Sequence, residues 1–122
     1  MNKITEDNIG KLLTEYIPEF LKDYKNFLKD NDGEKIIHVL FGAYLFPFTI
    51  KSIKNKKIST LKRIGKFLSK CFKFGDEKIV NIIHVSFFEN MKKEDFEKLV
   101  TYLSEELSVH MKEMDRKYKY FI

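Results

Sequence analysis

The sequence predicts an all-α protein, a single-domain bundle of about six helices around a central apolar helix at about residues 77–91. Apolar residues recur at helical spacing along almost the whole chain. Only two Pro and five Gly occur in 122 residues, too few for the many tight turns of a sandwich or barrel. Hydrophobic residues make up 43% of the chain, enough for a real core, so residues 1–122 are expected to form one domain.

Two helices are expected before residue 31. The first is indicated by apolar residues at i, i+3, i+4 and i+7, with Thr5 as its candidate N-cap: Ile9, Leu12, Leu13 and Tyr16. Pro18 should begin the second, because its missing N–H costs nothing in a first turn. Asn31-Asp32-Gly33 then predicts a turn that admits a positive φ.

A long apolar helix is expected next, from about Glu34 to Asn55. Pro47 lies in its interior, where proline removes one backbone hydrogen bond and clashes with the preceding turn. We therefore expect this helix to kink or split near Phe46.

Residues 59–74 form the most clearly amphipathic segment. One face is apolar: Leu61, Ile64, Phe67, Leu68, Cys71 and Phe72. The opposite face is basic: Lys62, Arg63, Lys66, Lys70 and Lys73. Gly75 and Asp76 then predict a junction, with the glycine as the left-handed C′ residue and the aspartate as the next N-cap.

Residues 77–91 are apolar nearly all round, which is typical of a helix surrounded by others. A last amphipathic helix is expected from Lys92 through Leu107, and the tail from Val109 onward extends its helical pattern. Three aromatic side chains of the tail are assigned either to the core or to a contact surface: Tyr118, Tyr120 and Phe121.

Charge is concentrated in one segment. Residues 51–73 contain nine Lys or Arg and no acid, whereas the other residues carry fourteen bases and eighteen acids. This contrast favours a surface for nucleic acid or another anionic partner, although a lysine-rich composition alone would also place a solvated basic face here. Ser59–Lys73 also has the pattern of a membrane-surface helix, but Phe67 and Phe72 are more simply explained as core.

The candidate partner-binding residues follow from this distribution. Glu89 and Asn90 join them because a carboxylate and an amide directly after Phe87-Phe88 must reach solvent, a cap or a partner. The full set is Lys54, Lys57, Lys62, Arg63, Lys66, Lys70, Glu89 and Asn90. The acidic stretches Glu6-Asp7 and Glu94–Glu106 are the alternative binding surfaces, and the residues leave this choice open.

Enzyme chemistry is not indicated, and we expect no catalytic, cofactor-binding or metal-binding residues. Neither His38 nor His84 has a histidine or cysteine partner at i, i+4 spacing, and no Gly-rich phosphate loop is present. Cys71, on the apolar face, is the only cysteine, which excludes a disulfide and fits a reducing compartment. The most apolar stretch, Ile36–Ile50, is shorter than the roughly twenty residues of a membrane span, so we expect a cytoplasmic protein.

One run of sequence has a recognisable pattern: an amphipathic helix, the Gly75-Asp76 junction and the segment Asn81-Ile-Ile-His-Val-Ser-Phe-Phe-Glu-Asn-Met91. This run resembles a small all-α family of bacterial immunity proteins from polymorphic and contact-dependent growth inhibition systems. Ala43 departs from that family, whose members often carry an acid there. The resemblance implies a protein that binds and neutralises a cognate toxin, without a cofactor. The alternative is a small helical nucleic-acid-binding protein that uses residues 51–73.

Overall fold

The computed structural model describes residues 3–121 and confirms the all-α prediction. Within these residues there is no strand, only one isolated bridge between Ile4 and Gly75. The α-helices are α1 (Ile9–Tyr16), α2 (Leu21–Asp30), α3 (Ile37–Val39), α4 (Phe46–Lys54), α5 (Ile58–Phe74), α6 (Glu77–Ile82), α7 (Lys93–Leu99) and α8 (Glu105–Tyr118).

Shorter helical segments of other kinds link these helices. Three are 3₁₀ turns: Pro18–Phe20, Phe88–Asn90 and Val100–Tyr102. Two are π-helical: Leu40–Leu45 and Ile83–Phe87. The expected six helices are thus divided into more and shorter pieces, because π and 3₁₀ turns interrupt the periodicity.

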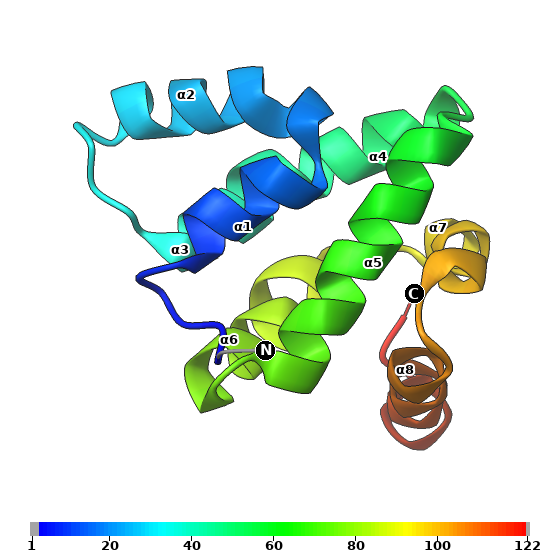
Figure 1. Ribbon diagram of the computed structural model, residues 1–122. Coiled ribbons are helices and arrows are strands. Elements are labelled where there is room, and N and C mark those ends of the chain that lie inside the picture. The colour runs from blue at the N-terminus through cyan, green and yellow to red at the C-terminus, as the bar shows by residue number, and fades with distance from the viewer. Residues whose placement is uncertain (1–2, 122) are drawn as a thin grey trace.

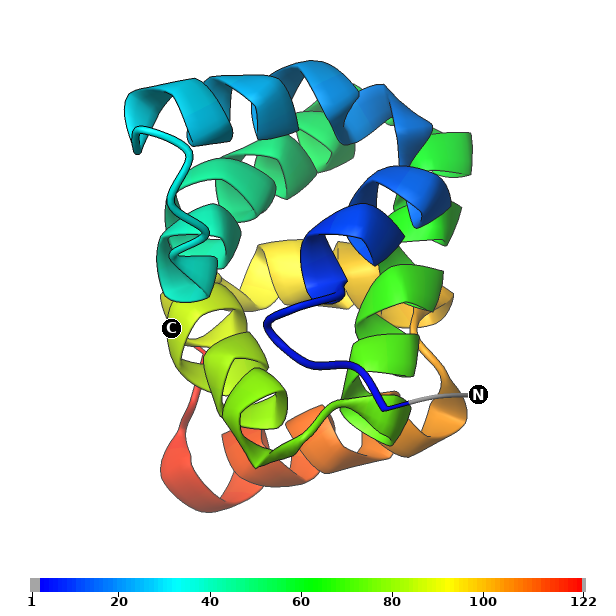
Figure 2. The ribbon, with the colours of Figure 1, turned by 60° about the vertical axis from the view of Figure 1, so that its left-hand side comes forward.

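Helix α5 runs between α2 at one end of the molecule and α8 at the other (Figures 1 and 2). It contacts α1, α4, α6, α8 and the turn Val100–Tyr102. Its apolar face is buried as expected, including Leu61, Ile64 and Phe67. Because Phe67 lies in the core and Phe72 packs against it, this face is occupied by the protein interior.

The start of α1 differs from the prediction. Asn8, not Thr5, occupies the N-cap position, and the first turn contains no acid. The Thr5 hydroxyl accepts a hydrogen bond from the Asp7 N–H at 3.3 Å, and Asn8 Oδ1 accepts one from the Thr5 N–H at 2.9 Å. Thr5 therefore orders the turn that precedes the helix, because its short side chain satisfies a nearby backbone donor.

The expected helix over residues 34–55 begins later, at Ile37, since Ile36 is extended. Near Phe46, where Pro47 is expected to kink or split the helix, the helix continues and changes type. The backbone is π-helical up to Leu45 and becomes α-helical at Phe46, with Pro47 in the first turn of α4. The π turn precedes a proline whose nitrogen carries no N–H, so Pro47 cannot donate the backbone hydrogen bond that an α-helix would require there.

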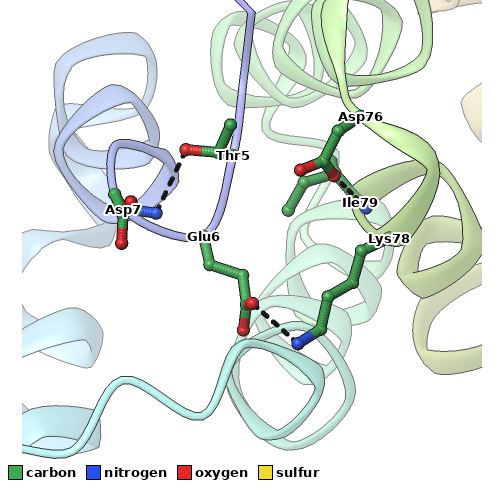
Figure 3. Close-up of polar contacts among 6 residues, drawn as sticks. All are labelled: Thr5, Glu6, Asp7, Asp76, Lys78 and Ile79. Carbon is green, nitrogen blue, oxygen red and sulfur yellow. Dashed lines mark hydrogen bonds and ion pairs between the residues drawn. The ribbon is translucent and has the colours of Figure 1, made fainter.

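The junction between α5 and α6 is stabilised by the N-terminal segment. Asp76 is the N-cap as predicted, and its Oδ1 accepts the Ile79 N–H at 2.9 Å. Gly75, however, is extended (φ −68°, ψ 148°) and not left-handed. It lies beside the buried Ile4, whose N–H donates to the Phe74 carbonyl at 2.8 Å. Figure 3 shows Glu6 of this segment reaching Lys78 of α6, 2.6 Å away.

Residues 77–91 lie in the core, but not as one regular helix. Helix α6 continues into the π-helical segment Ile83–Phe87 and then into a 3₁₀ turn. Both Phe87 and Phe88 are completely buried, whereas Val85 is 51% exposed. Residues 77–91 and α5 therefore form the centre of the bundle together. Residues 77–91 are not enclosed on every side, because Val85 faces solvent.

The expected helix over residues 92–107 is interrupted. It ends in the 3₁₀ turn Val100–Tyr102, and Ser104 begins α8 by accepting the Leu107 N–H at 3.2 Å. The sequence carries this signal, a serine followed by two glutamates. At the far end Lys119 is left-handed (φ 49°), and the chain turns back to bury Phe121 against Phe96.

Candidate partner-binding face

Four lysines of α5 form a row on the surface, which we call the lysine face: Lys62, Lys66, Lys70 and Lys73. Their spacing of three and four residues places them on one side of the helix. Three of them are exposed and Lys70 is half-buried. Among residues 3–121, none of the four forms an ion pair. No carboxylate within these residues neutralises their charge, although the Nζ atoms of Lys70 and Lys73 each lie 5.4 Å from the centre of the Phe74 ring.

The helix that carries the lysine face is held closely by its neighbours. Gly65 lies against the backbone of Tyr102, and a Cβ at this position would overlap the Tyr102 carbonyl. The Ser69 hydroxyl accepts a hydrogen bond from the Ser104 N–H at 2.8 Å. These contacts join α5 to the start of α8, so the lysines project from a fixed backbone.

Arg63 differs from the lysines because it is engaged within the protein. Its Nη1 donates to Glu19 Oε2 at 2.6 Å, and the Thr60 hydroxyl donates to the same oxygen at 2.8 Å. Burial alone would raise the pKa of Glu19, but hydrogen bonds from its backbone N–H, from Thr60 and from Arg63 hold that pKa below its ordinary value. Arg63 thus fastens α5 to the turn before α2.

Glu19 is a residue that the sequence reasoning did not include in the site. It lies at one wall of an open groove of about 410 Å³. The lining is more apolar than polar and contains both acids and lysines; it includes Asp23, Ala43, Tyr44, Pro47, Phe48, Lys51 and Lys57. The only sequence signal for Glu19 was its position after a helix-starting proline, which is also common in purely structural first turns.

The other two basic residues of the predicted set, Lys54 and Lys57, precede α5 in the sequence and are not part of the lysine face. Lys57 lines the groove that contains Glu19, and Lys54 lines a neighbouring groove with Phe46 and Ile50. A third groove, of about 380 Å³, runs between α5 and residues 102–106, and three members of the lysine face line it. The basic segment therefore borders grooves at both ends of α5.

Glu89 and Asn90 are not part of this surface. Both are exposed in the 3₁₀ turn Phe88–Asn90, and within residues 3–121 neither side chain forms a hydrogen bond or an ion pair. Burial, followed by the charge of Glu89, raises the pKa of Tyr120 to about 12. Glu89 thus lies near the C-terminal aromatic residues, and the structure does not bring it together with the lysines.

The acidic alternative over residues 94–106 is divided by the fold. Asp95 is only 9% exposed, and the carboxylates of Glu94 and Glu97 share α7 with Lys93 and Lys98. Three acids of α7 lie between two lysines, and Glu105 and Glu106 lie in a different helix, α8. The acids of this stretch are therefore split between two helices and partly offset by lysines, whereas the lysine face lies on one helix and has one sign throughout.

Cys71 is completely buried, and burial raises the pKa of its thiol well above the usual range. It is held as an unreactive core thiol. No helix within residues 3–121 combines the length and the apolar character that crossing a lipid bilayer requires.

The fold and this surface define a small all-α domain with a fixed basic helix face. The chain belongs to the family described as a domain of unknown function, DUF7674, whose model matches residues 10–119. The match covers α2 to α8 in full and α1 from its second residue, Gly10. No curated protein and no solved structure matches the chain significantly.

Proposed function

We propose that this protein is an immunity-type inhibitor, which binds a cognate bacterial protein toxin through the lysine face of α5 and thereby neutralises it. The observation that carries the proposal is a row of unpaired lysines on a helix that the core and Arg63 hold in place. The resemblance of residues 67–91 to immunity proteins supports the same class of function.

The lysine face is costly for the isolated protein. Lys62 and Lys66 stand four residues apart, as do Lys66 and Lys70, and like charges at this spacing destabilise a helix by about 0.2–0.5 kcal/mol per pair. Nothing within residues 3–121 offsets this repulsion by an ion pair. An acidic partner surface would remove the repulsion and accelerate encounter through long-range attraction.

The proposed partner surface is therefore acidic, and the basic side of this protein is the interface, in preference to Glu94–Glu106. Inhibition requires only that the complex covers the toxin's active or assembly surface. Because charge steering is screened by salt, association should slow as ionic strength rises above about 0.15 M.

A growth assay tests the proposal. The C-terminal fragment encoded by the adjacent upstream reading frame is expressed with and without this protein, and we expect toxicity that co-expression relieves, with the two proteins copurifying. A triple charge reversal on the lysine face, K62E/K66E/K70E, should abolish rescue. The matched control reverses three exposed lysines of α2, K22E/K25E/K29E, and should still rescue.

Each other result counts against the proposal. Toxicity that wild-type protein does not relieve would contradict an immunity role toward that toxin. Equal rescue by both triple variants would contradict the lysine face as the interface. Circular dichroism of the two variants checks that both retain helical content.

The same lysines support a second candidate, binding to nucleic acid. If the four lysines neutralise four phosphates of duplex DNA, raising the salt concentration from 50 to 200 mM should weaken binding by about a hundredfold. A flat binding curve over this range would exclude that function. A steep curve together with no rescue in the growth assay would favour it over toxin inhibition.

A further inference from the structure

Two histidines from different parts of the chain meet face to edge. His84 lies in the π-helical segment Ile83–Phe87 and His110 lies in α8. Their Nε2 atoms are 2.7 Å apart and their rings are nearly perpendicular, at 85°. They are 26 residues apart in sequence, so spacing within one helix could not reveal the pair.

The surroundings of His84 determine which of its nitrogens carries the proton. Its Nδ1 lies 2.8 Å from the carbonyl oxygen of Val80, which can only accept a hydrogen bond. Nδ1 is therefore protonated in the neutral ring, and the lone pair of Nε2 points at His110. In the neutral pair, His110 donates its Nε2–H to that lone pair. If His110 instead holds its proton on Nδ1, the Nε2 atoms of both histidines have a free lone pair, and both lone pairs are directed into the space between the two rings.

Aromatic side chains contact both histidines, one at the ring and one at the backbone. The Phe72 ring centroid lies 5.0 Å from that of His110, and the Tyr120 hydroxyl donates to the His84 carbonyl oxygen at 2.5 Å. Both histidines are half-buried, so water still reaches them. Burial and the neighbouring His84 hold the pKa of His110 below its ordinary value.

We propose that His84 and His110 form a binding site for one borderline divalent metal ion such as Zn²⁺ or Cu²⁺. Imidazole nitrogen is a preferred ligand of these ions. The Val80 carbonyl supplies the outer hydrogen bond that orients a metal-binding histidine. Within residues 3–121 no group of three or more His, Cys, Asp or Glu is placed to hold a metal, so water completes the coordination.

Metal binding requires the two rings to move. With bonds of about 2.0–2.1 Å, a tetrahedral Zn²⁺ separates two ligand nitrogens by about 3.3 Å, so the two rings must part by about 0.6 Å and tilt until both Nε2 lone pairs point at the ion. Bound metal would then link the segment Ile83–Phe87 to α8, and it would raise the melting temperature because it binds the folded state alone.

The test is titration of Zn²⁺ into tag-free, chelator-treated full-length protein at pH 7.4, followed by calorimetry. We expect one ion per chain, and H84Q and H110Q should each weaken binding by about tenfold or more. H38Q is the matched control, because His38 is the one remaining histidine of the sequence and is exposed in α3. This variant should bind Zn²⁺ as wild type does. Zn²⁺ should raise the melting temperature of wild type and H38Q only.

Electron paramagnetic resonance with Cu²⁺ provides an independent readout. Hyperfine coupling to two equivalent imidazole nitrogens is expected in wild type and to one in either variant, even if one variant is destabilised. Absence of binding would overturn the proposal, as would binding that survives in both H84Q and H110Q. A single coupled nitrogen in wild type would likewise show that the two histidines do not share an ion.

Discussion

Helix α5 and the segment Glu77–Asn90 are both central to the bundle, yet only α5 is regular along its whole length. Helix α5 has one apolar and one basic face, so it can keep α-helical geometry and place only one side against the core. The segment Glu77–Asn90 is apolar nearly all round, and it passes through α, π and 3₁₀ geometry. A segment that buries side chains on several faces changes its helical geometry to fit its neighbours. An amphipathic helix can stay regular, because it packs against the core on one face only.

The close packing of the two π-helical segments illustrates this adjustment. Leu40–Leu45 and Ile83–Phe87 contact each other, and a Cβ on Gly42 would lie 3.1 Å from the Ser86 carbonyl oxygen. Phe46 and Phe87 meet edge to face at 5.7 Å beside this contact. Near the lysine face, by contrast, the backbone is undistorted.

The largest expected effect is on stability, from a substitution in the segment Glu77–Asn90. It shows whether the side chains of this segment are buried and exposed as the structure indicates. Phe87→Ala should lower the free energy of unfolding by about 3–5 kcal/mol, because it removes a completely buried ring. Val85→Ala, two residues earlier but half-exposed, should change it by less than about 0.5 kcal/mol. Urea denaturation measures both, and similar losses for the two variants would contradict the described packing.

A smaller loss is expected from the closest contact of α5. Gly65→Ala should cost about 1–3 kcal/mol, since its Cβ would meet the Tyr102 backbone, which cannot move as freely as a side chain. Lys66→Ala, at the next and exposed position of the same helix, is the control and should change stability by about 0.5 kcal/mol or less. If Gly65→Ala were neutral, α5 and residues 100–104 would be less tightly joined than described.

The smallest effect concerns the pH dependence of the Arg63–Glu19 contact. The folded-state pKa of Glu19 lies below its ordinary value of 4.5, so the contact stabilises the protein above that pH and is lost as the pH falls through the lower folded value. Glu19→Gln should therefore be less stable than wild type at pH 7 and approach it near pH 3. Denaturation at both pH values measures the difference, and a gap independent of pH would contradict this assignment.

The regular helices could be predicted because the apolar residues of each recur at helical spacing on one face. The apolar face of α5 and the Asp76 cap agree with the structure in residue detail. The π turns could not be predicted, because they respond to packing between segments 40 residues apart. Ser104 was a readable cap signal that the continuous apolar pattern of residues 96–107 obscured.

The candidate site was predictable only in part, for a similar reason. The row of lysines follows from helical spacing alone. The ion pair that engages Arg63 with Glu19 and the contact between His84 and His110 could not be predicted in this way, because each joins elements that are distant in sequence. Glu89 and Asn90 were linked to the site by their polarity, but polarity does not say on which side of a bundle a turn emerges.

The contact of the N-terminal segment with the α5–α6 junction also has a consequence during synthesis on the ribosome. Glu6 and Lys78 are 72 residues apart, so at about 5–20 residues per second the growing chain waits roughly 4–14 s before this contact is available. Until residues 74–76 have been synthesised, Ile4 also lacks its backbone hydrogen-bond partners. The N-terminal segment is therefore fixed only after α5 and the start of α6 have been made.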